Sequence, residues 1–275
     1  ATGLTTVGAG GTASAVAGIP FYSADTSSIY TTDVSGTDDT ASGNSAYGYQ
    51  AMDAITTGDN NTAMGFDAMG ANTSGAANVS VGKDALKANT TASYNIAVGF
   101  EAMTANTTGT RNIAIGKSAY SASDTENDNL AIGLDALGGS VAGGEYNVAV
   151  GNYSLDALTS ADFVTAVGYD AGGAITSGVG SGALGTFNPS SNTDDNNTAV
   201  GYGALNALTT GVHNIAIGGT AMGGDPGPTT ENHNLAMGVN SMGGNIAGGE
   251  YNVMIGNYSV QSLTSADNSV GVGYL

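Results

Sequence analysis

The sequence predicts an all-β protein, a parallel β-solenoid of about 14 coils built by stacking one short unit. Three observations predict this fold. Glycine recurs at a constant 17-residue period from Gly48 to Gly133, and then with small slips as far as Gly273. The residues around it share the pattern Asn-x-Ala-h-Gly-x-x-Ala-h, where h is a large apolar residue. The composition, with 45 Gly and only 10% charged residues, lacks the runs of Leu, Glu, Lys and Arg that form long helices.

Each unit is expected to form two short strands and two turns, because a unit of this length is too short for two helices and a turn. Residues 95–103 carry the pattern in one copy, and 106–109 close that copy with Asn-Thr-Thr-Gly. Disorder is the other interpretation of so much Gly and Ser, but apolar residues at a fixed period are not typical of a disordered chain.

The repeat glycines are expected at coil corners, because glycine adopts positive φ without a steric penalty. They are Gly48, Gly65, Gly82, Gly99, Gly116, Gly133, Gly151, Gly168, Gly201, Gly218, Gly238 and Gly256.

Alternation along a strand places Ile96 and Val98 on one face and Ala97 on the other. We expect the larger pair to form the core of the solenoid. The middle position is nearly always Ala, which favours close approach of a second chain, although Ala could also only tolerate a tight bend. The predicted chain–chain contacts are Ala97, Ala114, Ala131 and Ala149.

The repeated pattern resembles the YadA-like head repeats of trimeric autotransporter adhesins and the related repeats of phage tail fibres. The resemblance covers roughly residues 44–275 and rests on many copies of the pattern, such as Asn95, Ala97, Val98, Gly99 and Ala102. It implies a left-handed β-roll with three chains packed side by side, that is, a homotrimer. The 17-residue unit is longer than the shortest adhesin coils and is closer to the tail-fibre repeats.

Domain organisation follows the period. Residues 1–43 lack it and are expected to form a junction or cap, whereas 44–275 form the repeat domain. Irregularities are expected at 223–233 and at 172–197, where the glycine spacing first shortens and then lengthens if Gly180 is a corner. Residues 185–197 and 223–233 are expected to project as loops and to carry any attachment function.

Charge limits the partners. The net charge is −19, and the basic residues number four, which argues against nucleic-acid binding and contact with an anionic membrane. No apolar run is long enough to cross a bilayer, so membrane insertion is not expected. With no cysteine, neither a disulfide nor a thiolate metal site can form. An extracellular, cell-surface or virion location fits this balance. The four basic residues are Lys83, Lys87, Arg111 and Lys117, and we expect them to neutralise acids stacked in neighbouring coils.

Candidate chemistry is sparse. His213 and His233 could form a metal site or a general base, but two solvated loop residues are the simpler interpretation. The acidic turns 124–129 and 192–197 offer oxygen ligands for Ca²⁺, yet Asp and Asn also form ordinary turns. No other cofactor and no catalytic residue is expected.

Two recurrent residue types have alternative uses. Asn-x-Ser/Thr sequons, for example at Asn72, Asn89 and Asn106, are expected to be a by-product of turn chemistry. Aromatic residues follow several repeat glycines and could stack on sugars or, as we expect, on one another. These aromatic residues are Tyr49, Phe66, Phe100, Tyr169 and Tyr202.

The sequence therefore favours a structural fibre protein, a rigid rod that supports host or surface attachment, over an enzyme. The alternative is a bacterial adhesin head or a subunit of a self-assembling extracellular filament. Self-association is the expected interaction, as a homotrimer or end to end, and a cell-surface or glycan receptor is kept open. An ice-binding solenoid is disfavoured, because it would need a flat Thr array and the Thr residues gather in turns.

Overall fold

The computed structural model divides into two compact units, Ala1–Asn129 and Leu130–Leu275, and each is described by itself. The residues that the structure describes are 14–16, 19–21, 28–31, 40–185, 196–206, 211–223, 231–244, 249–260 and 266–274.

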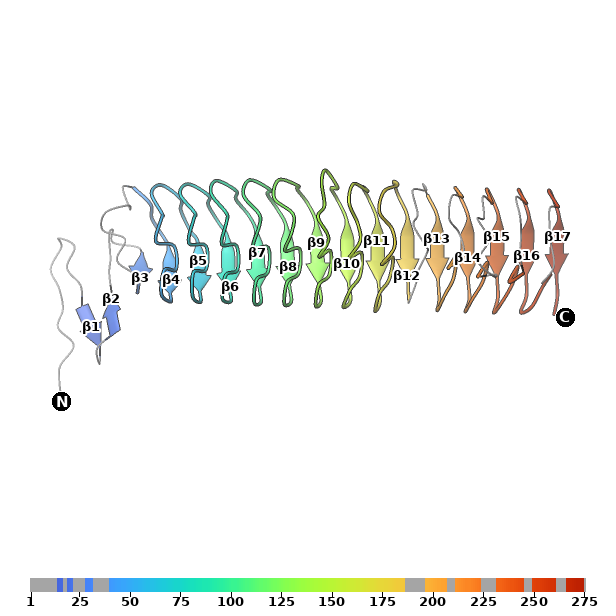
Figure 1. Ribbon diagram of the computed structural model, residues 1–275, viewed down its shortest axis with the longest axis horizontal. Coiled ribbons are helices and arrows are strands. Elements are labelled where there is room, and N and C mark those ends of the chain that lie inside the picture. The colour runs from blue at the N-terminus through green and yellow to red at the C-terminus, as the bar shows by residue number, and fades with distance from the viewer. Residues whose placement is uncertain are drawn as a thin grey trace. The chain divides into compact units, whose positions relative to one another are not determined.

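The first unit contains a parallel ladder of short strands, β3 to β8, that lie side by side in chain order (Figure 1). Each strand is in register with the next, as in the pairing of Ile96 with Ile113. An antiparallel pair precedes them, formed by β1 (Ser14–Val16) and β2 (Ile19–Phe21). The ladder strands are β3 (Ile29–Tyr30), β4 (Ser45–Tyr47), β5 (Thr62–Met64), β6 (Val79–Val81), β7 (Ile96–Val98) and β8 (Ile113–Ile115).

The second unit repeats this architecture with strands β9 to β17, again parallel and in chain order (Figure 1). They are β9 (Leu130–Ile132), β10 (Val148–Val150), β11 (Thr165–Val167), β12 (Gly182–Leu184), β13 (Thr198–Val200), β14 (Ile215–Ile217), β15 (Leu235–Met237), β16 (Val253–Ile255) and β17 (Val270–Val272). Both units are therefore parallel β-solenoids, and the predicted fold class is confirmed.

The coils differ from the prediction in having one strand each among the described residues rather than two. The segment after the corner cannot be extended, because Glu101 and Met103 both have a φ of 55°. This segment still bonds between coils, since the Met103 N–H donates to the carbonyl of Ala119 at 2.9 Å. Equivalent positive-φ residues recur from coil to coil, so the second side of the solenoid is a stack of turns.

The repeat glycines are corner residues, as predicted. Gly99 has a φ of 141°, and a Cβ atom added there would lie 2.3 Å from the carbonyl oxygen of Gly116. The twelve predicted glycines all have φ between 124° and 145°. Glycine is thus required both for its backbone angle and for the close approach of successive coils.

The predicted orientation of the strands is wrong. Ala97 is fully buried, whereas Ile96 on the same strand is 36% exposed. The reason is the volume of the core: Ala102 and Met103 fill it from the side opposite the strand, so that only a methyl group fits between them and the backbone. The proposed contacts Ala97, Ala114, Ala131 and Ala149 are each 0% exposed inside one chain and cannot face a second chain.

The coil boundaries also need correction. The ladder extends back to β3, where Ile29 pairs with Ser45, although the repeat domain was expected to start at residue 44. The irregularity expected at 172–197 is smaller than predicted, because the corner is Gly185 rather than Gly180 and β12 keeps its register with both neighbours. Of this segment, residues 186–195 lie outside the described part, and so do the attachment loops predicted within it.

The irregularity predicted at 223–233 is confirmed by the pairing of β14 with β15. Ile215 pairs with Leu235, so this coil is longer than the common 17-residue period. The extra residues fall in 223–233, of which 224–230 lie outside the described part. Nowhere in the described residues is there a helix that could span a bilayer. The role of 1–43 as a junction or cap stays a prediction.

Candidate functional site: an apolar outer face

The most distinctive surface is an apolar outer face, made of four columns of side chains that repeat from coil to coil. Two columns are the outward residues of the strands, equivalent to Ile96 and Val98. The other two lie two residues before and two residues after the strands, equivalent to Tyr94 and Phe100. Among the described residues, 25 large apolar or aromatic side chains are exposed, and all but Val179 and Tyr258 fall in these four columns.

The members of the outer face occur in both units. They are Tyr94, Tyr146, Phe163 and Tyr251 before the strands; Ile29, Ile96, Ile215 and Val270 at the first outward position; Tyr47, Met64, Ile115, Val167, Leu184, Met237, Ile255 and Val272 at the second; and Tyr49, Phe66, Phe100, Tyr169, Tyr202, Val239 and Tyr274 after the corner.

The local backbone explains why these side chains point outward. Alternation along the strand turns Ile96 and Val98 away from the buried Ala97. Tyr94 precedes the strand with a φ of 64°, and Phe100 follows the corner glycine. The remainder of the coil surface is polar, as at Thr108. Each unit is therefore an amphipathic solenoid.

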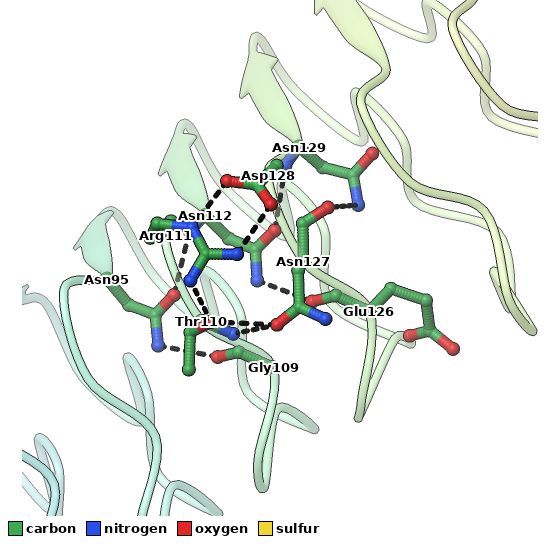
Figure 2. Close-up of polar contacts among 9 residues, drawn as sticks. All are labelled: Asn95, Gly109, Thr110, Arg111, Asn112, Glu126, Asn127, Asp128 and Asn129. Atoms are coloured by element: carbon green, nitrogen blue, oxygen red, sulfur yellow. Dashed lines mark hydrogen bonds and ion pairs between the residues drawn. The ribbon is translucent and has the colours of Figure 1, made fainter.

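A buried asparagine ladder supports the outer face from inside. The side chain of Asn95 donates through Nδ2 to the carbonyl of Gly109 at 2.8 Å. Its Oδ1 accepts from the backbone N–H of Asn112 in the next coil at 2.9 Å (Figure 2). Asn112 repeats both bonds with Glu126 and Asn129. Each Asn satisfies backbone groups in its own coil and the next, which is why this polar residue can be buried before most of the strands. Val164, Ser181 and Ser269 take its place before β11, β12 and β17.

The asparagine ladder was missed by sequence reasoning, although its signal was present. Asn stands at the first position of the repeated pattern, directly before most of the strands. A polar residue held at a fixed position next to a strand indicates a buried hydrogen-bonding role. In the second unit the same bonds recur, as in the Asn214 N–H donating to Asn197 Oδ1 at 2.9 Å.

A second ladder explains the sequons. Asn72, Asn89 and Asn106 are each 0% exposed, and the Nδ2 groups of Asn89 and Asn106 donate to the Oδ1 of the preceding Asn at 2.9 and 3.2 Å. These asparagines cannot accept a glycan in the folded chain, because their side chains are occupied in the core. They belong to the structural repeat.

Lys83, Lys87 and Arg111 pair with acids, as predicted, whereas Lys117 forms no ion pair within the part of the chain that the structure describes. Lys87 Nζ lies 2.7 Å from Asp67 Oδ2 and 3.2 Å from Asp84 Oδ1, and Lys83 also binds Asp84. The hydrogen bond from Lys83 holds the pKa of the Asp84 carboxyl below its usual value. These pairs are partly exposed, so each contributes little to stability on its own.

The second unit has a matching acidic group without a basic partner. Its three carboxylates are Asp135, Asp156 and Asp170, and no Lys or Arg follows residue 117. Burial raises the pKa of Asp156, and the charges of Asp170 and Asp135 raise it further. The first unit also has a carboxyl of this kind, because burial and the charge of Asp67 raise the pKa of Asp53.

The acidic turn at 124–129 uses its oxygens within the protein. Asn127 Oδ1 accepts from the Thr110 N–H at 2.8 Å, and Asp128 forms a two-point ion pair with Arg111 at 2.6 and 2.7 Å (Figure 2). Within the described ranges, no group of three or more His, Cys, Asp or Glu could hold a metal ion. The calcium hypothesis is therefore not supported at 124–129. Most of the other candidate turn, 192–197, lies outside the described ranges, so the hypothesis is untested at that turn.

The prediction that exposed aromatic residues stack on one another is confirmed for Tyr49 and Phe66 but not for Phe100 or Tyr202, which contact no other ring within the described residues. Tyr49 and Phe66 stack with ring centroids 5.6 Å apart, and the Lys83 ammonium lies 5.8 Å from the Phe66 ring and 5.1 Å from the Phe100 ring. Tyr169 contacts Tyr153 edge to face. Where rings stack on neighbours, their faces are partly covered, which disfavours sugar stacking at those positions.

The two histidines are exposed, as expected, but they are not independent loop residues. His213 and His233 stack on each other with centroids 4.9 Å apart, and Tyr251 stacks on His233 at 4.8 Å. They belong to the same column of the outer face as Tyr94. Sequence reasoning missed this contact because the separation of the two histidines departs from the common period.

Comparison with known proteins adds no name to this geometry: no protein-family model, curated protein or solved structure matches the chain. The function must therefore be argued from the fold and from the outer face.

Proposed function

We propose that this chain is a structural rod protein that associates with further copies of itself through the apolar outer face and supports attachment to a host or another surface. The observation that carries the proposal is the concentration of exposed apolar side chains in four adjacent columns. Covering such an apolar patch removes it from water and so stabilises the assembled state. The setting that we propose is extracellular, on a cell surface or on a virion.

A second copy of the same chain is the partner that best fits this face. With a net charge of −19, two copies repel one another, so association has to come from apolar contact. In the second unit, nine strands stacked at about 4.8 Å and a width of about 20 Å give roughly 850 Å². That area is close to the roughly 800 Å² that each partner buries in a typical stable interface.

Three copies packed side by side is the assembly implied by the resemblance to adhesin heads and tail fibres. This proposal moves the contact from the buried alanines to the outward residues of the strands. Cross-coil hydrogen bonding and the two asparagine ladders would make each copy stiff, which suits a mechanical role and needs no catalytic group. The alternatives are an adhesin head and a subunit of an open-ended filament. A measured mass of three chains would favour the trimeric rod over the filament.

The test is the native mass of matched lysine variants. Val98→Lys with Ile115→Lys places two charges on the outer face, and we expect the assembly to dissociate. The control is Thr104→Lys with Ser121→Lys, in the polar column where Lys87 already stands one coil earlier. Sedimentation should show wild-type mass for the control and monomer mass for the outer-face variant. Equal masses for both variants would remove the outer face as the contact.

A further inference from the structure

The only two histidines of the chain are brought together by the coil register. Their separation in the sequence departs from the common period, yet His213 and His233 have the same φ of 59° and occupy the same column. The His233 N–H donates to the carbonyl of Val212 in the preceding coil at 3.0 Å, which fixes the two backbones side by side. Their rings are stacked within 10° of parallel.

Both imidazoles are available to a ligand. Both residues are exposed, and among the described residues neither side chain takes part in a hydrogen bond or an ion pair. The polar neighbours in the adjoining column are Asn232 and Glu250, which bond to each other at 2.9 Å. The ring nitrogens therefore face solvent on a backbone held by the parallel ladder.

We propose that His213 and His233 together bind one divalent transition-metal ion of the Zn²⁺, Ni²⁺ or Cu²⁺ class. Neutral imidazole is the preferred nitrogen ligand for these ions, and the chain has no cysteine to compete for them. Metal–nitrogen bonds are about 2.0–2.1 Å, so the two rings must tilt until one nitrogen of each points at a common position. Exposed side chains make such rotations readily, and waters complete the coordination.

The affinity for the metal ion is expected to come from the presence of two imidazoles on adjacent coils. A single exposed imidazole binds such ions weakly, whereas two on adjacent coils act on one ion with most of the geometry already fixed by the backbone. A third imidazole in the same column would add a further ligand. Asn196 stands one coil before His213 in that column, and Asn268 stands beyond Tyr251. These two positions offer a matched pair of substitutions.

The experiment is calorimetric titration of the full chain with ZnCl₂, and separately with NiCl₂, in a non-coordinating buffer near pH 7.5. We expect saturable binding of one ion per chain. His213→Phe and His233→Phe keep a stacking ring but remove the nitrogens, and each should weaken binding at least about tenfold.

The added-ligand variants complete the test. Asn196→His should tighten binding, whereas Asn268→His, which is separated from His233 by Tyr251, should leave it unchanged. The proposal is overturned if the wild-type chain shows no saturable binding, if both phenylalanine variants bind as the wild type does, or if the two added histidines have equal effects. Because His213 and His233 lie on the outer face, the titration is repeated on the Val98→Lys, Ile115→Lys variant, so that burial of the imidazoles in an assembly is distinguished from failure to bind the ion.

Discussion

Ser123 occupies the position of Asn106 one coil later, and its hydroxyl does not bond to the Asn106 side chain. Asn106 Oδ1 and Ser123 Oγ are both buried without a hydrogen-bond partner. The second asparagine ladder, which runs from Asn72 through Asn89 to Asn106, therefore ends at Ser123 because serine is too short to continue it.

Extending this ladder should stabilise the protein. In Ser123→Asn, the new Nδ2 group can donate to Asn106 Oδ1, and we expect a gain of about 1 kcal/mol in the free energy of unfolding. Ser123→Ala is the control, since it removes one unpaired atom and leaves the other. Thermal unfolding compares the three proteins. A lower midpoint for the Asn variant than for the Ala variant would mean that the longer side chain does not fit.

The corner glycines should not tolerate a side chain. In Gly99→Ala, the Cβ atom meets the Gly116 carbonyl oxygen at 2.3 Å and the backbone is held at positive φ. Strain of this kind costs about 1–3 kcal/mol before any clash is counted. Gly182→Ala is the control, because an added Cβ there has no atom within 4 Å. Denaturant unfolding should show a clear loss only for the corner variant, and equal losses would contradict the corner role.

Replacing a buried alanine of the strands with a larger residue should destabilise the fold. Ala114→Leu adds three carbons where Ala114 is 0% exposed, and overpacking of this kind costs about 1–3 kcal/mol. Ile113→Leu on the outward side should be nearly silent in a dissociated chain. Unfolding measured at two protein concentrations separates folding from assembly. If Ala114→Leu left unfolding of the single chain unchanged and lowered only its assembly, the alanines would be chain contacts after all.

Stability should depend on pH through Asp156. Its folded pKa is raised by burial and by Asp170 and Asp135, so the folded state binds this proton more tightly than the unfolded state does. The ionised carboxylate therefore costs stability at neutral pH, and this cost disappears as the pH falls through the folded pKa towards 3.8. Asp156→Asn should raise the melting temperature at pH 7 and flatten its rise on acidification.

Asp124→Asn, which removes one negative charge at an exposed turn, serves as the control for the change in net charge. The ion-paired Asp84 has the opposite effect on the pH dependence of stability, and it does so over a lower pH range. Because its pKa is lowered, its contribution is present above 3.8 and is lost only as the pH falls below that value. A wild-type profile that fell steadily from pH 7 to pH 4 would contradict the assignment to Asp156.

The repeat could be predicted from the sequence because it depends only on spacing. The period, the parallel stacking and the positive φ of glycines such as Gly99 are consequences of that spacing. The direction of the strand faces could not be predicted, since alternation separates Ile96 from Ala97 without saying which one is inside. That choice depends on how much room Met103 leaves in the core, and Met103 itself has a positive φ that nothing in its residue type indicates.

The outer face and the histidine pair escaped prediction for related reasons. With the strand faces reversed, the two columns equivalent to Ile96 and Val98 were assigned to the core, and only the aromatic residues after the corner glycines were expected at the surface. His213 and His233 are off the common period, and only the pairing of Ile215 with Leu235 shows that the longer coil brings them together.

Coil length in this chain is free to vary while the strand register is kept. Gly182 and its partner Thr198 are closer in the sequence than Ile215 and its partner Leu235, yet both pairs lie in one uninterrupted ladder. The strands on both sides of the longer coil keep their register with their neighbours. Peptide epitopes could therefore be inserted into chosen turns of the ladder, where their separation would be set in steps of about 4.8 Å, the distance between neighbouring strands.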